Sequence, residues 1–414
     1  MRKIKAALIG AGQRGADSYA PYALKHPEEI EFTAVAEPEK ERRDAFRDLF
    51  GIPERNCYES WEMLLEDENE AEAVLICTQD REHFGPAMKA IEKGYHILLE
   101  KPVSFLESEC EQIKKAAETY DKVFLICHVL RYTPFFMKLK ELLEEGRIGD
   151  LQNIQWIENV GYWHQAHSYV RGNWRDSKES SPMILAKCCH DMDMLLWLAS
   201  ADCTSVSSFG SLGHFKKENA PEGAPQRCLD GCPEKEQCPY YAPRIYIDWR
   251  DDWQADVIKR VVSKDTSDKA VMEALKKGPY GRCVYHCDND VVDHQVVNLE
   301  FENGVAASFT MSAFSYECSR VLKFMGTKGE ISGKLEDGRL KVIDFLTGKQ
   351  ENISIEASAN GHGGGDEGIM KAFLKMILEG HNTAGASSAV SSLQSHKMAF
   401  AAEASRINKT VITL

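Results

Sequence analysis

Short apolar runs alternate with amphipathic stretches along the first third of the chain. The runs cover residues 5–9, 31–36, 73–78, 96–100 and 123–127, and stretches with helical spacing, such as 85–93, lie between them. Strands that are buried on both faces and connected by helices produce this rhythm. We therefore predict an α/β domain over residues 1–127, with a doubly wound parallel sheet.

The pattern changes beyond about residue 150. Apolar and polar positions alternate over residues 151–158, 291–300, 305–313, 321–325 and 340–345, and Asn-Gly or Asp-Gly turns separate several of these segments. Helical spacing predicts one continuous helix over 183–199 and two more over 367–379 and 392–408, before a short strand over 410–414. These elements predict an α+β second domain, residues 128–414, with a large, mostly antiparallel open sheet.

A polar segment over about residues 215–290 is rich in Cys, Pro and Trp and is predicted to be an insertion in the second domain. Cys228, Cys232 and Cys238 are closely spaced, and with Cys283 they offer four thiolates for a structural Zn²⁺ ion. Three alternatives stay open. Cys287 is a second candidate for the fourth ligand, an iron–sulfur cluster is another type of centre, and reduced thiols also pack as small apolar groups.

Composition limits the classes of partner and location. A length of 414 residues suits two or three domains, and a net charge of −14 argues against nucleic acid or an anionic membrane as the main partner. We find neither a secretory signal nor an apolar run of about 18 residues that would span a membrane. With 13 cysteines, these features predict a cytoplasmic protein with reduced thiols.

The first apolar run ends directly in a glycine-rich turn. Gly10, Gly12 and Gly15 form the pattern G-x-G-x-x-G, and the second predicted strand ends at Glu37. A turn of this kind brings the N–H groups of a helix start up to a pyrophosphate, and an acid about 20 residues later accepts hydrogen bonds from a ribose. Strand, glycines, helix, strand and acid together predict a dinucleotide site.

The tripeptide Glu100-Lys101-Pro102 follows another predicted strand at the ligand-binding edge of the sheet. Burial and the positive charge of a nicotinamide would lower the pKa of such a lysine, so that Lys101 can transfer a proton. The proline restricts the turn and holds the lysine in place. The alternative is an ordinary surface turn.

Six motifs together resemble the Gfo/Idh/MocA oxidoreductase family. They are the glycine fingerprint, Thr78-Gln-Asp-x-x-His83, Glu100-Lys-Pro102, Arg131-Tyr-x-Pro134, Gly146-x-Ile-Gly149 and His190-x-x-Asp193. The resemblance implies a Rossmann domain, a second domain whose open sheet often forms an oligomer interface (a homodimer or homotetramer), and NAD(P)-dependent oxidation of a sugar or cyclitol hydroxyl. It also implies that Lys101 and His190 are catalytic, and that cofactor contacts include Gln13, Arg14, Thr78, His83, Glu100 and Lys101 itself.

The chain departs from the family pattern just before this histidine. Where the family usually has an aspartate, the chain has Ala186, and Lys187 follows. In a continuous helix Lys187 and His190 share one face, and Asp193 lies one turn further, so the three would present a cation, a base and a carboxylate to one substrate. The alternative is a surface pair of Lys187 with Asp191 and a buried, hydrogen-bonded histidine.

Two further segments supply candidate substrate contacts. The stretch 162–175 is dense in aromatic rings and donors, and aromatic rings cover the apolar face of a sugar while His and Arg bind its oxygens. The second is a glycine-rich loop before the helix over 367–379, in which Asp366 is also a candidate helix cap. The candidates in the two segments are His164, His167, Arg171, Trp174, Arg175 and His362.

These features predict an NAD-dependent enzyme that acts on a small carbohydrate. It is either a dehydrogenase that releases NADH or a redox-neutral glycosidase, which oxidises C3 transiently, eliminates the aglycone, adds water and returns the hydride. A non-catalytic NAD sensor is disfavoured because it needs neither Lys101 nor His190. A metal-binding interaction module is disfavoured because the candidate cysteine ligands are confined to one insertion. Glu37 would repel the 2′-phosphate of NADP, with Arg42 and Arg43 as the counter-argument, so NAD is predicted as the cofactor.

Overall fold

The computed structural model describes residues 2–248, 253–356, 361–380 and 385–414. A six-stranded, entirely parallel sheet in the order β3-β2-β1-β4-β5-β6 forms the first domain, as predicted. This order is that of a Rossmann fold, in which β1 and β4 lie at the centre, on either side of the switch point. Its strands are β1 (Ile4–Ile9), β2 (Ile30–Ala36), β3 (Cys57–Tyr58), β4 (Ala73–Ile76), β5 (His96–Leu99) and β6 (Phe124–Ile126).

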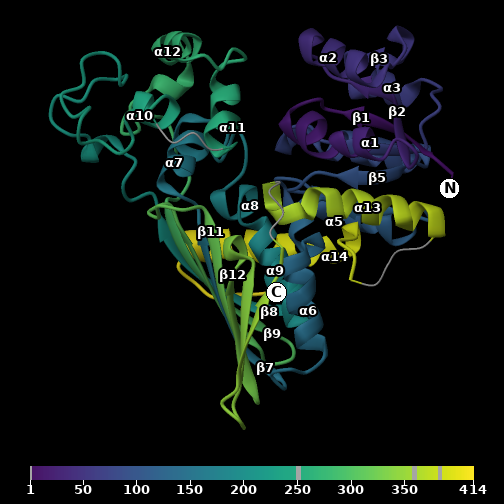
Figure 1. Cartoon of the computed structure of the whole chain (residues 1–414), viewed down its shortest axis with the longest axis vertical. Helices are drawn as coiled ribbons and strands as arrows, with labels where there is room; N and C mark the ends of the chain where they lie inside the picture. Colours follow the sequence, from purple (N-terminus) through teal and green to yellow (C-terminus); the bar gives the residue numbers. More distant parts are fainter. Residues whose placement is uncertain (1, 249–252, 357–360, 381–384) are drawn as a thin grey trace.

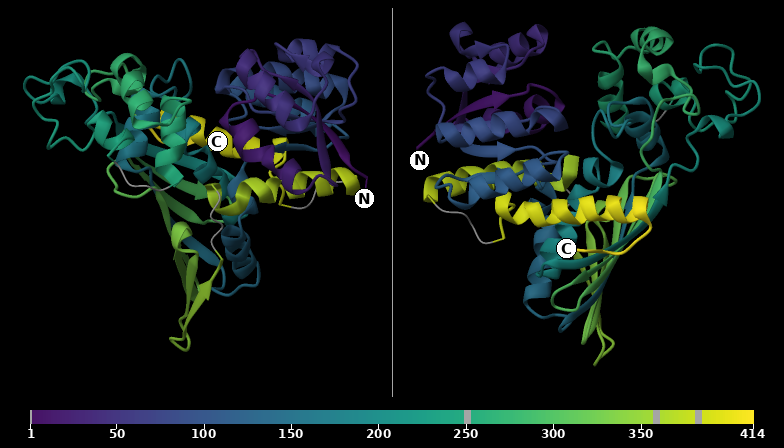
Figure 2. Two further views of the ribbon diagram at one scale, coloured as in Figure 1. Left: turned by 45° about the horizontal axis from the view of Figure 1, so that its top comes forward. Right: turned by 180° about the vertical axis from the view of Figure 1, so that it is seen from behind.

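Helices cover both faces of this sheet, and one of them comes from the far end of the chain. The local helices are the π-helical turn η1 (Gln13–Tyr19), α1 (Pro21–Lys25), α2 (Lys40–Phe50), α3 (Trp61–Glu66), α4 (Phe84–Lys93) and α5 (Glu107–Glu118). Helix α13 (Gly365–Glu379) places Ile369, Met370 and Phe373 in the same apolar core as β1 and β2, each fully buried. Figures 1 and 2 show α13 lying along the Rossmann sheet.

The second domain is built on a nine-stranded sheet in the order β14-β13-β12-β11-β7-β10-β9-β8-β15. All its strand pairs are antiparallel except β7 with β10, which confirms the predicted large, mostly antiparallel sheet. The strands are β7 (Leu151–Asn159), β8 (Cys203–Ser211), β9 (His294–Phe301), β10 (Ala306–Ser312), β11 (Ser319–Gly326), β12 (Gly329–Lys334), β13 (Arg339–Asp344), β14 (Gln350–Ser354) and β15 (Ile412–Thr413).

In the part of the chain that the structure describes, helices cover one face of the large sheet. Their apolar side chains meet those of the strands in a core that includes Trp156, Phe309 and Met398. The opposite face carries a row of exposed apolar side chains on neighbouring strands: Val321 is paired with Ile157, and Val296 with Phe209. The helices of this domain include α6 (Pro134–Glu144), α8 (Met183–Ala186), α9 (Cys189–Ala199) and α14 (Ala389–Asn408).

The predicted continuous helix over 183–199 is wrong. The chain forms two helices, α8 and α9, with a break at Lys187 and Cys188, where ψ of Cys188 is 5°. The cause is local packing, because the break turns Lys187 toward β7, as described below. As a result, Lys187 and His190 do not occupy one continuous helical face.

The insertion stands above the upper end of the large sheet in Figure 1, and the Rossmann domain lies at the same end. It contains α10 (Ala242–Tyr246), α11 (Trp253–Val262) and α12 (Asp268–Lys277), and it encloses a small apolar core of its own around Phe215, Tyr240 and Val284. Lys264 forms ion pairs with Glu39 (3.4 Å) and Glu41 near the start of α2, so the insertion reaches the Rossmann domain. Within the described ranges, no helix is long and apolar enough to cross a membrane.

Candidate functional site

The glycine-rich turn after β1 leaves space for a ligand beside the first turn of η1. Gly10 has φ of 90°, and a Cβ atom there would lie 2.6 Å from the carbonyl oxygen of Cys77. A Cβ on Gly15 would lie 2.3 Å from the oxygen of Gly10, whereas a Cβ on Gly12 would meet nothing within 4 Å. Gly10 and Gly15 are therefore required for the turn itself, and Gly12 faces open space. This arrangement fits a dinucleotide pyrophosphate.

The carboxylate of Glu37 lies against this turn. It accepts hydrogen bonds from the N–H groups of Ala11 (2.8 Å) and Glu39 (3.0 Å), so it is held where an adenosine ribose would bind. Arg42 and Arg43 do not neutralise this carboxylate. Arg42 pairs with Glu39 at 2.9 Å, and Arg43 donates to the backbone oxygen of Glu37 and pairs with Glu59 at 3.2 Å.

Glu100, at the end of β5, is the centre of a buried polar cluster. Its carboxylate accepts from the Tyr19 hydroxyl (2.6 Å), from Nε of Arg14 (2.6 Å) and from the backbone N–H of Lys101 (2.8 Å). Burial opposes the charged form, but the positive charges of Arg14 and Lys101 lower the pKa of Glu100 to about 2. The same guanidinium also donates to Asp366 at 2.8 Å, which connects the glycine-rich turn after β1 to the first turn of α13.

Lys101 reaches from the first domain to the segment of the second domain that precedes His190. Lys101 donates from Nζ to the backbone oxygen of Ala186 at 3.2 Å. Burial, reinforced by the charge of Lys101, lowers the pKa of His190 well below its usual range, so the ring is neutral at neutral pH. Its Nδ1 atom is buried and has no hydrogen-bond partner within the described structure. A neutral ring beside a cation can accept a proton from a substrate.

His362 approaches the same place from the glycine-rich loop before α13. Its ring centroid is 5.7 Å from that of His190, and its Nδ1 atom is 3.3 Å from Oδ2 of Asp366. Its backbone is left-handed, with φ of 55°, which is uncommon for a residue with a side chain. Burial lowers the pKa of His362. The sequence prediction that this loop contributes to the site therefore has a structural basis in its contact with His190.

The residues after β4 hold the turn that carries Lys101. The His83 ring lies between two backbone oxygens, with Nδ1 2.6 Å from Pro102 and Nε2 3.2 Å from Thr78. The Thr78 hydroxyl donates to the oxygen of Glu82 at 2.9 Å. Two loops at the ligand-binding edge of the sheet are thereby fixed relative to each other. Gln13 is exposed at the start of η1, on the same edge.

Lys187 faces β7 and β11, and within the described residues it does not form the surface pair with Asp191 that was the alternative to a face shared with His190. Its Nζ atom lies 2.9 Å from Glu158, which also pairs with Arg320 at 3.0 Å, while Asp191 pairs with Arg320 at 2.8 Å. The negative charge of Glu158 raises the pKa of Lys187, although burial of the amine opposes its charged form. Burial raises the pKa of Glu158, although the positive charges of Arg320 and Lys187 lower it. The result is a buried acid–base pair next to His164 and His362.

A cavity of about 230 Å³ adjoins this end of the site. Cys318 lies in its wall, and its sulfur is 3.8 Å from Nδ1 of His164. The wall is formed by aromatic, acidic and basic side chains together, namely Trp163, Tyr316, Glu317, Cys318, Lys334, Glu336 and Asp337. Such a mixture suits a ring with one apolar face and several hydroxyl groups.

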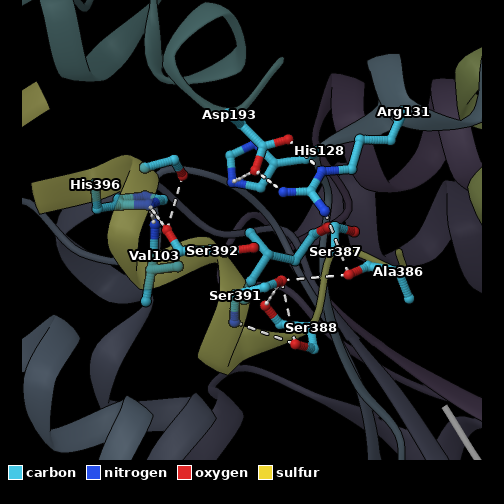
Figure 3. Close-up of polar contacts among 12 residues, drawn as sticks. Val103, His128, Arg131, Asp193, Ala386, Ser387, Ser388, Ser391, Ser392 and His396 are labelled. Carbon is cyan, nitrogen blue, oxygen red and sulfur yellow. Dashed lines mark hydrogen bonds and ion pairs between the residues drawn. The ribbon is translucent and has the colours of Figure 1, made fainter. Parts of the chain in front are cut away.

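Asp193 lies in a buried ion pair that ties α9 to the loop after β6. Both of its oxygens accept from Arg131, at 2.7 Å from Nε and 2.6 Å from Nη2, and its side chain is fully buried. The His128 ring lies between those of His190 (6.0 Å) and His396 (5.7 Å). His396 accepts from the N–H of Val103 at 2.9 Å and thereby supports the turn that carries Lys101 (Figure 3). Asp193 is placed to position His190 rather than to touch a ligand.

Most of the predicted contacts in the stretch 162–175 contact the insertion or neighbouring aromatic rings, and their role in binding substrate stays a prediction. His167 is 3.0 Å from the hydroxyl of Tyr246 and stacks on Tyr280, both in the insertion. Arg171 is buried beneath the insertion, and Arg175 pairs with Asp288 at 2.9 Å. Trp174 packs beside Tyr169. Of the six predicted substrate contacts outside α9, only His164 and His362 approach the groups around His190 and Lys187.

Comparison with known proteins identifies the family. The NAD-binding Rossmann domain of an oxidoreductase family matches residues 4–128, and the C-terminal α/β domain of the same family matches residues 140–414. The chain belongs to the Gfo/Idh/MocA oxidoreductase family. This confirms the resemblance, the fold class and an NAD-binding Rossmann domain.

Individual relatives are distant. The oxidoreductase YteT of Bacillus subtilis (strain 168) is 23% identical over 309 residues, which cover 71% of this chain and 69% of YteT. A 2,7-anhydro-N-acetylneuraminate hydratase of Mediterraneibacter gnavus is 24% identical over 51% of the chain and 53% of that protein. The solved structure of levoglucosan dehydrogenase with NADH and levoglucosan superimposes with a TM-score of 0.73 and 18% identity, covering 100% of this chain and 99% of the other.

Sequence reasoning missed Glu158, His128, His396 and the ion-pair role of Asp366. A signal existed for Glu158, because Ile154, Trp156 and Glu158 occupy alternate positions of β7 and all face inward. An acid on the buried face of a strand indicates a partner cation. His396 lies within a long helix, and no local pattern marks it. The division of the chain into domains at residue 127 stays a prediction. Helix α13 belongs to the predicted second domain by sequence but packs on the sheet of the first.

The buried histidines predict how stability depends on pH. Burial lowers the pKa of His396 to about 4 and that of His128 to about 3, whereas an unfolded histidine titrates near 6.5. Between pH 6.5 and 4 only the unfolded state binds these protons. Each histidine therefore contributes stability that is present above pH 6.5 and falls by about 1.4 kcal/mol per pH unit as the pH drops toward 4.

In a His396→Gln variant, we expect the free energy of unfolding from urea titrations to fall about 1.4 kcal/mol per pH unit less steeply across this range. Glutamine can still accept the hydrogen bond from the N–H of Val103, but it does not titrate in this range. A loss of packing lowers the stability equally at every pH, whereas the loss of a titrating group changes the slope with pH. An unchanged slope would contradict the assignment.

Proposed function

We propose that the protein is an NAD-dependent enzyme that oxidises a hydroxyl group of a sugar, a sugar derivative or a cyclitol. The observation that carries this proposal is the convergence of Lys101 and His190 from two domains, beside a glycine-rich turn that fits a dinucleotide. A sensor or a structural domain needs no neutral, unpartnered histidine next to a lysine. NAD, when bound, supplies the hydride acceptor.

The residues have separate roles in this proposal. His190 accepts the proton of the reacting hydroxyl, because its ring is neutral and its Nδ1 atom is without a partner in the described structure. Lys101 stabilises the negative charge that develops on the substrate oxygen. Glu37 binds the ribose, and the N–H groups around Gly12 bind the pyrophosphate. The substrate ring extends toward Lys187 and the cavity beside Trp163.

The pair of Lys187 with Glu158 favours a second candidate, a redox-neutral elimination. A 3-keto sugar has an acidic C2–H, and a buried carboxyl with a raised pKa beside an amine can remove that proton. The relative named as a hydratase supports this candidate, because its name does not describe a net oxidation. We rank this candidate second because Lys101 and His190 are sufficient for a net oxidation, which does not need the pair of Lys187 with Glu158.

A panel of sugars, cyclitols and aryl glycosides, incubated with NAD, tests both candidates. A dehydrogenase accumulates NADH, measured at 340 nm, in proportion to the oxidised product found by chromatography. A redox-neutral enzyme releases free sugar at constant 340 nm absorbance and incorporates solvent deuterium at C2. We expect the first result. No turnover on any carbohydrate, despite bound NAD, would contradict the proposal.

Single substitutions test the two residues that act on the reacting oxygen of the substrate. Lys101→Ala and His190→Ala should each lower kcat by about 10²-fold or more, because each removes a group that acts on the reacting oxygen. NAD binding, measured by calorimetry, should change little, since neither side chain holds the dinucleotide. Lys138→Ala, on the exposed side of α6, is the matched control. A variant of either residue with near wild-type kcat would remove that residue from the mechanism.

The preference for NAD over NADP is tested by fluorescence titration. The carboxylate of Glu37 repels a 2′-phosphate, and Arg42 and Arg43 are engaged elsewhere, so NAD should bind at least about tenfold more tightly. Glu37→Ser should narrow the ratio of the two affinities, whereas Glu41→Ser, which replaces an exposed acid in the first turn of α2, should leave it unchanged. Tighter binding of NADP by the unmodified protein would overturn the assignment.

Two further expectations complete the proposal. We place the enzyme in the cytoplasm, on the strength of its reduced cysteines. We also propose a homo-oligomer that covers the open face of the large sheet, where Ile157, Phe209, Val296 and Val321 form one exposed apolar row across neighbouring strands.

A further inference from the structure

Four cysteines of the insertion surround one small cavity. Cys228, Cys232, Cys238 and Cys283 all line a space of about 10 Å³, which holds a single occupant the size of a water molecule. Cys287 does not line it, and its sulfur donates instead to the backbone oxygen of Cys283 at 3.3 Å. The cysteines that converge are therefore the four that the sequence spacing singled out, with Cys283 as the fourth.

The backbone brings these residues together from distant parts of the insertion. A β-bridge between Arg227 and Arg282 sets Cys228 beside Cys283, with hydrogen bonds from Cys228 N to Gly281 O (3.0 Å) and from Cys283 N to Gln226 O (2.9 Å). Gly231, with φ of 83°, allows the tight turn between Cys228 and Cys232. These contacts close a loop of more than fifty residues, whose segment 220–241 contains no helix or strand.

A second observation, from charge, points to an anion at the same place. Arg171 is fully buried; its Nε donates to Arg282 O and its Nη2 to Tyr240 O, each at 2.7 Å, and Nη2 lies 3.7 Å from the sulfur of Cys228. Its Nη1 atom has no partner in the described structure. No carboxylate among the described residues forms an ion pair with this guanidinium, although a buried charge is costly without a counter-charge.

We propose that Cys228, Cys232, Cys238 and Cys283 bind one Zn²⁺ ion as four thiolates, and that Arg171 balances part of the negative charge of this centre. Four thiolates around one Zn²⁺ carry a net charge of −2, so the buried guanidinium gains the counter-charge that it otherwise lacks. The size of the cavity favours a single ion over a cluster of several metal atoms. The insertion, which has only a small core of its own, gains a cross-link between its two ends.

The four sulfurs lie farther apart in this structure than a zinc centre requires. Tetrahedral zinc with Zn–S bonds of about 2.3 Å places the sulfurs about 3.8 Å apart. No three of these cysteines have all their sulfurs within 4.8 Å of one another; among the described residues, only His26, Glu28 and Glu29 meet that criterion. Binding of one zinc ion therefore requires the four cysteine side chains to move closer together around the cavity that they line.

Metal analysis of the purified full-length protein tests this proposal independently of any enzymatic activity. We expect about one zinc per chain by mass spectrometry, and four additional reactive thiols when a strong chelator removes the metal. Iron with acid-labile sulfide would overturn the single-ion assignment. Absence of stoichiometric metal, with the four thiols reactive from the start, would overturn the site itself.

Matched variants locate the ligands. Cys238→Ser should lose nearly all bound zinc, whereas Cys287→Ser, in the same insertion but outside the cavity, should retain it. Arg171→Met should lower zinc affinity by about 10- to 100-fold in competition with a colorimetric chelator, as expected for a group that supports the ligands from outside. Arg175→Met, which removes an ion pair with Asp288 nearby, is the control. Equal zinc content or affinity across these variants would contradict the proposal.

Discussion

The arrangement of the site depends on the neutralisation of one buried carboxylate, that of Glu100. This side chain is almost fully buried, and it keeps its charge only because Arg14, Tyr19 and the N–H of Lys101 surround it. The same bonds fix the glycine-rich turn, the end of β5 and the proposed catalytic lysine relative to one another. Through Arg14 they also reach Asp366, so one charge-balanced cluster aligns both domains around the reaction centre.

A second cluster repeats this principle on the other side of His190. Arg131 and Asp193 hold α9 against the loop after β6, while Glu158, Arg320 and Asp191 hold it against the large sheet. His190 is thereby positioned from two directions by buried ion pairs between α9 and the elements packed against it. The neutral state of its ring follows from this enclosure, since burial penalises the imidazolium form.

The sequence predicted the features that depend on local pattern. The parallel strands, the glycine-rich turn, Glu37 and the Glu100-Lys101 pair follow from short apolar runs and from residues adjacent to them. Features set by packing between distant segments escaped it. The break at Lys187 arises because Glu158, on another element, attracts the amine. Arg171 was predicted to bind substrate because arginine suits oxygen-rich ligands, but its partners, Tyr240 and Arg282, lie more than sixty residues away in sequence.

The position of α13 has a consequence for how the chain folds as it is made. The six strands of the first domain are complete at residue 126, yet one face of their sheet is covered by apolar side chains between residues 369 and 377. About 250 further residues must be translated before that cover exists, which takes on the order of 10 to 50 seconds at ordinary rates of synthesis. During that interval the nascent chain exposes an unfinished apolar surface, so the emerging protein is a natural client for chaperones at the ribosome.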